Sequence, residues 1–172
     1  MNSCDATANY MRRHGLVLVT AESCTAGLIA ANLADIPGAG ATLDCAYITY
    51  SPDAKREVLG VPPEILRRHN LTSEPVAEAM VRGALARSRA NVAIADTGVV
   101  DDSDPAIPAG TQCLAWAFQL SGGDVAVFTA TCRFDGDRRE IREATAEYAL
   151  GRLPHYHRQA LQQRDEAVAS AG

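Results

Sequence analysis

Three side chains in the first third of the sequence, Ser23, Tyr50 and Lys55, are of the types that acyl transfer requires. A serine hydroxyl is a weak nucleophile until a base removes its proton, and a lysine amine is such a base when burial keeps it neutral. A tyrosine hydroxyl can relay the proton or hold the intermediate. Tyr50 and Lys55 span an expected strand end and helix start, so both can face one cleft. Backbone N–H groups after Ser23 can supply an oxyanion hole.

Lys55 is the only lysine among 16 basic residues, and the others are arginines. The chain therefore uses arginine wherever a surface cation suffices, and a lone lysine indicates a task that arginine cannot perform. Arginine stays protonated, whereas a desolvated lysine can lose its proton. The alternative is that Ser23 caps a helix, Tyr50 packs at a strand end and Lys55 is solvated. The spacing of the three residues does not exclude this alternative.

The segments around these residues alternate between strand-like and helix-like patterns. This order, followed by a hairpin and a last helix, predicts an α/β domain: a three-layer α/β/α sandwich with a mixed central sheet. We expect one domain over residues 1–172, with a core from about 6 to 152 and a polar tail over 153–172. The expected strands cover 16–20, 43–50, 92–95, 111–120 and 125–133. The expected helices cover 6–14, Ser23 or Thr25 to about 34, 52–59, 62–69, 72–88 and 137–152.

Three of the expected strands end in polar or small residues. These ends are Glu22-Ser23, Thr49-Tyr50 and Asp96-Thr97-Gly98. In open α/β sheets, ligands bind beyond the carboxyl ends of the strands, so we expect one site at this edge. Cys24 follows Ser23 at an expected helix start, where the pKa of a thiol can fall, although we interpret Cys24 as a small packing residue.

The composition argues against several classes of protein. The net charge of −5 disfavours a broad nucleic-acid surface, and no apolar stretch reaches the ~18 residues of a membrane span. The N-terminus has neither the basic nor the apolar region of a signal peptide, which predicts a cytoplasmic protein. The five cysteines are odd in number and widely spaced, which disfavours both a disulfide framework and a zinc site.

The histidines and the acidic residues carry weaker signals. A histidine-based triad is less favoured, because all four histidines lie in polar contexts where exposed side chains are expected. The stretch Asp101–Asp104 can bind a hard cation, but it lacks the glycine and the glutamate of a calcium loop, and we interpret it as solvated. We therefore expect no metal and no cofactor. The histidines are His14, His69, His155 and His157.

A set of motifs in a fixed order resembles the CinA C-terminal domain family over about residues 16–152. Several members of this family are nicotinamide mononucleotide deamidases, which hydrolyse the carboxamide to nicotinic acid mononucleotide and ammonia. The motifs are Thr20–Gly27, Tyr47–Ser51 with Lys55, Leu59–Pro62, Ser73–Ala77 and Thr97-Gly98.

The resemblance implies Ser23 as nucleophile, with Lys55 and Tyr50 in the proton transfer. It also implies a small nucleotide-like substrate, with Thr97 and the turn around Thr25 and Gly27 on the ligand side. Together with the strand ends, this gives a predicted substrate-binding set. The set is Glu22, Cys24, Thr25, Gly27, Thr49, Thr97 and Gly98.

The chain departs from the family pattern after Thr97-Gly98. Members usually have a glycine-rich loop there, whereas this chain has Val99–Pro105, with three carboxylates and no glycine. Glycine lets a backbone approach a ligand closely, and carboxylates repel a phosphate unless a cation bridges them. A second departure is Ala26, where a glycine is common.

Two hypotheses follow. The leading one is an amidohydrolase acting on nicotinamide mononucleotide or a related small amide, and the lone lysine favours it. The alternative is a non-catalytic CinA-like protein that binds a ligand or a partner, and the altered loop favours that one. The apolar hairpin edge Val125–Phe128 can pair with a second subunit, which would give a homo-oligomer.

Overall fold

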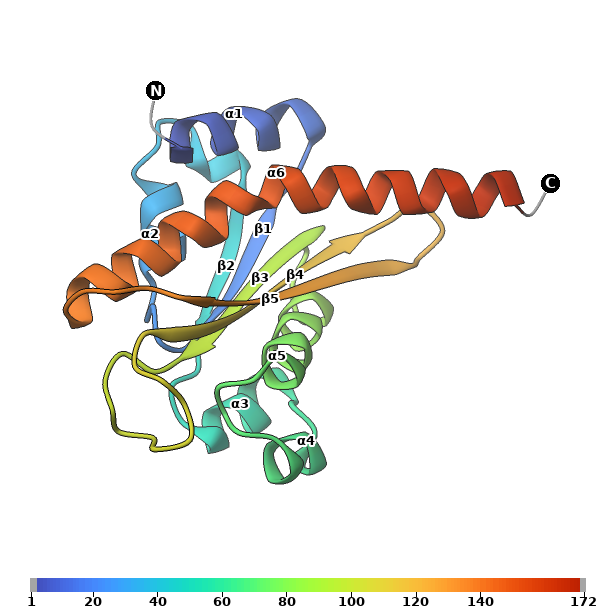
Figure 1. Ribbon diagram of the computed structural model, residues 1–172. Coiled ribbons are helices and arrows are strands. Elements are labelled where there is room, and N and C mark those ends of the chain that lie inside the picture. Colours follow the sequence, from blue (N-terminus) through green and yellow to red (C-terminus); the bar gives the residue numbers. More distant parts are fainter. Residues whose placement is uncertain (1–2, 171–172) are drawn as a thin grey trace.

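The centre of the computed structural model, which describes residues 3–170, is a mixed β-sheet (Figure 1). Its strands are β1 (Leu18–Glu22), β2 (Leu43–Ile48), β3 (Val92–Gly98), β4 (Thr111–Gln119) and β5 (Val125–Arg133). Within the described residues they lie in the order β2-β1-β3-β4-β5. β1 is parallel to both β2 and β3, whereas β3–β4 and β4–β5 are antiparallel. The mixed sheet confirms this part of the predicted fold class.

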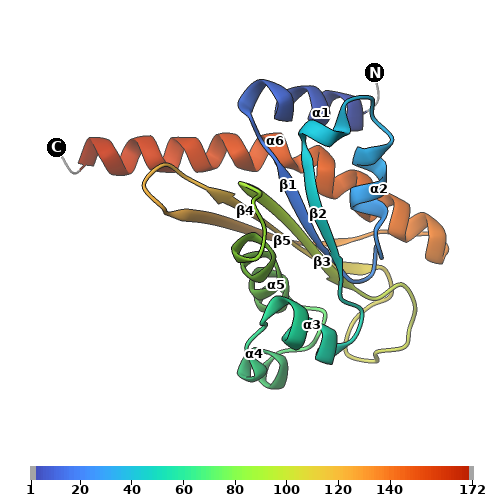
Figure 2. The same cartoon turned by 180° about the vertical axis from the view of Figure 1, so that it is seen from behind.

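Helices cover both faces of the sheet, as Figures 1 and 2 show from opposite sides. One face carries α1 (Ser3–His14), α2 (Leu28–Ala34) and α6 (Arg138–Ser170). The other carries α3 (Pro52–Leu59), α4 (Pro63–Arg68) and α5 (Glu74–Ala86). A single 3-10 turn, η1 (Ala39–Ala41), precedes β2. The three-layer arrangement is confirmed, and the first helix and the hairpin lie close to where the sequence predicts them.

The core divides along the two faces of β4. Side chains alternate between the faces of a strand, so Trp116 and Phe118 pack towards α1 and α6, whereas Ala115 and Ala117 pack towards α5. Trp116 is fully buried, and its indole N–H donates to the main-chain carbonyl of Ala149 in α6 at 2.9 Å. Large side chains on one face and small ones on the other allow α5 to lie close to the sheet.

The start of α2 differs from the sequence prediction. The helix begins at Leu28, so the expected start at Ser23 or Thr25 is wrong. The buried carboxylate of Glu22, at the end of β1, caps this helix in place of a serine hydroxyl, because it satisfies N–H groups that have no partner within the helix. Ser23 is thereby left without a capping role. The main-chain N–H groups that donate to Glu22, at 2.7, 3.1 and 3.0 Å, belong to Gly27, Ile29 and Ala30.

The last helix is also longer than expected, because α6 continues through Pro154 to Ser170. Proline has no N–H, so the carbonyl four residues earlier, that of Leu150, loses its helical partner. The hydroxyl of Thr7 in α1 donates to this carbonyl at 3.2 Å. A tertiary contact therefore satisfies the group that the proline leaves unpaired, and the predicted helix end at residue 152 is wrong.

His157 lies on the same helix and is buried, so the expectation that all four histidines are exposed is wrong. Its Nδ1 lies 2.8 Å from the hydroxyl of Tyr10 in α1. Burial lowers the pKa of His157. Within residues 3–170, no helix is long and apolar enough to cross a membrane.

Candidate active site

Ser23 and Lys55 meet beyond the carboxyl end of β1. The amine Nζ of Lys55 lies 2.9 Å from the hydroxyl Oγ of Ser23, and the two side chains are 1% and 7% exposed, respectively. Lys55 sits in the first turn of α3, which starts where the sequence predicts. The hydroxyl of Ser51 caps this helix by accepting the N–H of Ala54 at 3.1 Å. The helix start thus directs the lysine stem back towards the sheet.

Two main-chain carbonyls orient the lysine amine. Nζ donates to the carbonyl of Thr49 at 2.7 Å and to that of Tyr50 at 3.3 Å. A neutral amine has two N–H bonds and one lone pair, so when both N–H groups face these carbonyls the lone pair can face Ser23. Burial lowers the pKa of Lys55 to about 8, although the charge of Asp96 opposes this shift. A substantial fraction of the amine is therefore neutral near physiological pH.

A fully buried carboxyl group, that of Asp96 in β3, lies behind the turn that carries the serine. It accepts the main-chain N–H groups of Ser23 and Thr25, each at 3.1 Å. The hydroxyl of Thr25 contacts Asp96 and also Glu22, but it has one proton and cannot donate to both. One carboxyl group must then carry a proton of its own whenever both contacts are hydrogen bonds. Asp96 is the better candidate, because burial raises its pKa to about 6. Above that pH its carboxyl group is mainly ionised, and the hydroxyl of Thr25 then donates to only one of the two carboxylates at a time.

The same contacts decide which amide of the turn can serve as an oxyanion donor. The N–H groups of Ser23, Thr25 and Gly27 are taken by the two buried carboxylates. The N–H of Ala26 donates to the carbonyl of Ser23 at 3.2 Å. Among residues 3–170, the amide of Cys24 has no hydrogen-bond acceptor. The sequence predicts that several N–H groups after Ser23 can serve as oxyanion donors, and the structure leaves one of them, that of Cys24, available.

Arg142 of α6 fixes the back of this turn. Its guanidinium donates to the carbonyls of Cys24 and Thr25, both at 2.9 Å. The Cys24 thiol is buried, and burial together with the charge of Asp96 raises its pKa to about 11. Cys24 is thus a neutral thiol at physiological pH and is not competing with Ser23 as a nucleophile.

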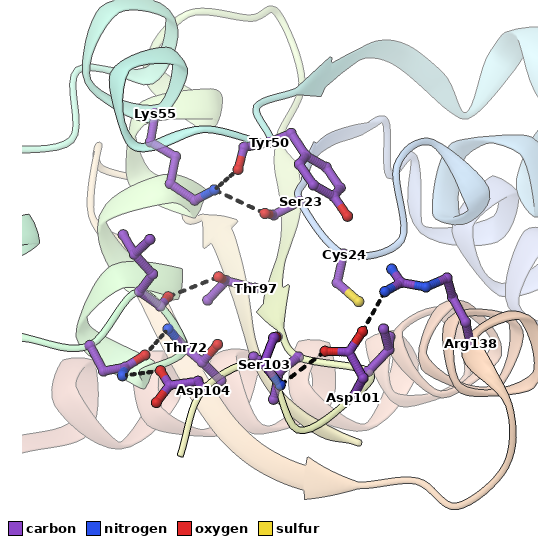
Figure 3. A pocket seen from close by; sticks show the side chains of 15 residues that line it. Ser23, Cys24, Tyr50, Lys55, Thr72, Thr97, Asp101, Ser103, Asp104 and Arg138 are labelled. Atoms are coloured by element: carbon purple, nitrogen blue, oxygen red, sulfur yellow. Dashed lines mark hydrogen bonds and ion pairs between the residues drawn. The ribbon is translucent and has the colours of Figure 1, made fainter. Parts of the chain in front are cut away.

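A cavity of about 350 Å³ opens in front of Ser23 (Figure 3). Of the residues that the sequence predicts to act at the site, six line it: Ser23, Cys24, Tyr50, Lys55, Thr97 and Gly98. The ring of Tyr50 is 63% exposed at the wall, and within residues 3–170 its hydroxyl has no hydrogen-bond partner. Thr97 is buried, and its hydroxyl donates to the carbonyl of Leu71 at 2.8 Å, which ties β3 to the segment before α5.

The other four predicted residues do not line the cavity. Glu22 caps α2, and Thr25 lies between the two buried carboxylates. Thr49 is fully buried and contributes its carbonyl to Lys55. Gly27 is the N-cap of α2 with φ 100°, a conformation that favours glycine. These four residues hold the parts of the site in place from behind.

Ala26 lies between these residues and has φ 48°, in the left-handed region. Such a conformation costs a residue with a Cβ atom roughly 1–2 kcal/mol. The sequence departure at this position therefore leaves the backbone in a conformation that glycine would adopt more easily.

Several residues that shape the site were given no role from the sequence. Asp96 was named at the end of an expected strand, and a carboxyl group directly after the apolar run Val92–Ala95 is unusual in a buried strand, which was a usable signal. Arg142 carried none, since nothing in a helical pattern identifies the carbonyls that a side chain will reach. Further lining residues were also missed, among them Asn70, Leu71 and Thr72 and, from α6, Arg138.

The mixed sheet between two layers of helices places this protein in the α/β class, with a buried serine–lysine pair at the carboxyl edge of the sheet. The sequence profile of the CinA C-terminal domain matches residues 3–157. The chain belongs to the CinA C-terminal domain family.

The chain matches one relative over most of that relative's length and other relatives over only about a third of theirs. The chain is 42% identical over 146 residues to the nicotinamide-nucleotide amidohydrolase PncC of Pseudomonas putida, covering 84% of this chain and 88% of that protein. It is 41% identical over 150 residues to a CinA-like protein of Akkermansia muciniphila, covering 86% of this chain but 35% of that protein. The chain thus spans about a third of the length of such longer relatives.

The fold agrees with a solved structure of the same superfamily. The crystal structure of a CinA superfamily protein from Klebsiella pneumoniae 700603 superposes with a TM-score of 0.80 at 34% identity. The match covers 89% of this chain and 96% of that chain.

Proposed function

We propose that this protein is an amidohydrolase that attacks the carboxamide of nicotinamide mononucleotide or a related small amide with Ser23. The observation that carries the proposal is the buried 2.9 Å contact between Lys55 Nζ and Ser23 Oγ. Burying an amine costs free energy unless it is paired or loses its charge, and a neutral amine beside a hydroxyl is the arrangement a general base needs. The name of the P. putida relative supports the class of substrate.

Acylation begins when neutral Lys55 accepts the hydroxyl proton of Ser23. Oγ then bonds to the carboxamide carbon, and the carbonyl oxygen becomes an oxyanion. The N–H of Cys24, which has no acceptor among the described residues, is the donor for this oxygen; one such donor is worth about 3 kcal/mol in a protease. The C–N bond breaks, Lys55 returns its proton to the leaving nitrogen, and ammonia departs. An ester between Ser23 and the acid remains.

Water completes the cycle. Lys55, neutral again, removes a proton from a water molecule, which attacks the ester carbon. The C–Oγ bond breaks, and the proton on Lys55 returns to Ser23. The net reaction consumes one amide and one water and yields one carboxylic acid and one ammonia.

For Tyr50 we propose a part other than the proton relay that the sequence predicts. Lys55 contacts the main-chain carbonyl of Tyr50, while the ring lines the cavity. We assign the ring to packing against the aromatic carrier of the amide, so Tyr50→Phe should retain most activity. Thr97 and Gly98 line the same cavity.

The alternative is a CinA-like protein that binds a ligand or partner without catalysis. Its basis is the acidic loop after Gly98 in place of a glycine-rich one. The buried amine argues against it, because a ligand-binding role alone gives no reason to bury Lys55 beside Ser23.

Ammonia release separates the two. The protein is incubated with nicotinamide mononucleotide and with the corresponding riboside, and ammonia is measured. Ser23→Ala should lower the rate at least about a thousandfold. Ser121→Ala, which removes an exposed hydroxyl in the turn between β4 and β5, is the matched control. Ammonia release that is the same in Ser23→Ala and wild type with both compounds would overturn the proposal.

A further inference from the structure

The rim of the cavity opposite Ser23 is formed by an acidic loop whose carboxylates occupy the nearby donors. Arg138 is paired with Asp101 at 2.6 Å. The side-chain amide of Asn70 donates to Asp104 at 2.7 Å. Figure 3 shows Asp101 and Asp104 across the cavity from Lys55. The two side chains best placed to bind an anion at the rim are thus already bound to carboxylates of the same chain.

Two main-chain amides of this loop are occupied in the same way. The N–H of Ser103 donates to Asp101 at 3.1 Å, and that of Ala106 donates to Asp104 at 2.9 Å. Phosphate groups bind proteins through free main-chain N–H groups and through arginine or lysine. At these two amides, the loop's own carboxylates take the positions that phosphate oxygens would need.

The charges that line the cavity also disfavour a phosphate group. Its lining contains two cations, Lys55 and Arg138, and two carboxylates, Asp101 and Asp104. The reaction requires Lys55 to be neutral, which leaves Arg138 against two negative charges. Hydrogen bonds from Ser103, together with Arg138, lower the pKa of Asp101, and hydrogen bonds from Asn70 and Ala106 lower that of Asp104. The reactive cavity therefore has a net negative rim that repels a phosphate.

We propose that the substrate is a carboxamide on a carrier that has no phosphate group, such as a pyridinium nucleoside, and that Asp101 and Asp104 determine this specificity. The inference rests on the proposed function, since it concerns the substrate of the same Ser23. A pyridinium ring carries a positive charge that the rim carboxylates attract. The cavity of about 350 Å³ is at the small end of ligand sites, which suits a nucleoside.

The test compares nicotinamide riboside with nicotinamide mononucleotide, two compounds that differ by one phosphate. For the wild-type protein, we expect kcat/KM for the riboside to exceed that for the mononucleotide by at least about tenfold. The double substitution Asp101→Asn with Asp104→Asn should raise kcat/KM for the mononucleotide about tenfold, mainly through a lower KM. It should also raise KM for the riboside, because the carboxylates that attract the pyridinium charge are gone, so the ratio of the two kcat/KM values should fall from both sides.

Asp102→Asn is the matched control, because this carboxylate lies in the same exposed loop and does not line the cavity. It should leave the ratio of the two kcat/KM values unchanged. A wild-type protein that prefers the mononucleotide, or a double variant with an unaltered ratio, would overturn the inference while the amidohydrolase proposal stands.

Binding to Ser23→Ala separates the two proposals in the remaining case. If neither compound releases ammonia, the amidohydrolase proposal fails for them. Calorimetric titration of Ser23→Ala with each compound then still measures their affinities, and the ratio of the two affinities gives the selectivity of the rim. Tighter binding of the riboside supports the inference about phosphate, and tighter binding of the mononucleotide contradicts it.

Discussion

The inner wall of the cavity, with the buried groups behind it, and the rim contain the same kinds of charged group. The surroundings of these groups have opposite effects on their charge. At the inner wall, burial lowers the pKa of Lys55 to about 8, and directly behind this wall burial raises that of Asp96 to about 6. On the rim, hydrogen bonds lower the pKa of Asp101, whose side chain is 51% exposed in its pair with Arg138. Burial thus brings the inner groups towards neutrality near physiological pH, whereas solvent keeps the rim permanently charged. The inner wall is suited to moving protons, and the rim is suited to selecting the charge of a ligand.

The largest effect is expected from removing the base on the inner wall. Lys55→Arg keeps a cation but cannot supply a neutral amine, so kcat should fall about a thousandfold. Ammonia release under saturating substrate measures this loss. Lys55→Met, which keeps the apolar stem without a charge, covers the case in which a buried arginine disturbs folding, and circular dichroism checks both variants. Activity above a tenth of wild type in Lys55→Arg would show that Lys55 is not the base.

A smaller effect, on stability, is expected from the helix cap behind the inner wall. Glu22→Gln replaces a carboxylate that accepts three main-chain N–H groups with an amide that cannot accept them all, so the free energy of unfolding should fall by about 2–3 kcal/mol. Urea denaturation measures it. Glu57→Gln, at an exposed glutamate of α3, is the control and should change stability little. Equal stability of the two variants would mean that Glu22 is not an important cap.

The next effect is a shift of the pH profile. In the wild-type protein, kcat/KM should rise with pH through an apparent pKa near 8, because only neutral Lys55 accepts a proton. The charge of Asp96 raises the pKa of Lys55. Asp96→Asn should therefore move the rising limb of the pH profile of kcat/KM to lower pH, by roughly one unit. The position of the limb is the readout, because loss of a hydrogen bond to the turn would lower kcat without moving it.

Asp53→Asn provides the control for this shift, since Asp53 is exposed in the first turn of α3. Its limb should coincide with that of the wild type. A limb that stays in place in Asp96→Asn, or moves to higher pH, would contradict the electrostatic link between the two buried groups.

The smallest effect should come from salt, which distinguishes the walls without a mutation. Exposed charges are screened at ionic strengths of about 0.5 M, whereas buried ones are screened much less. The preference for the riboside over the mononucleotide should fall about threefold between about 0.05 and 0.5 M salt. The apparent pKa near 8 should move little. A large shift of that pKa with unchanged selectivity would reverse the roles assigned to the two walls.

Residue type and local sequence pattern were sufficient to predict the fold class, the start of α3 and two residues of the candidate site. A lone lysine in an arginine-rich chain pointed to Lys55, a strand end pointed to Ser23, and alternating patterns predicted the α/β sandwich. The start of α3 at Ser51-Pro52 was readable because a cap and a proline act within one turn. Such features depend on neighbours in the sequence, so the sequence alone determines them.

Only the tertiary structure decided which groups share protons and hydrogen bonds. Asp96 meets the Ser23 turn from 73 positions away, and Thr7 reaches the carbonyl left open by Pro154 from 143 positions before its partner. No local pattern records these partners, since a donor does not specify which distant acceptor the packing will place against it.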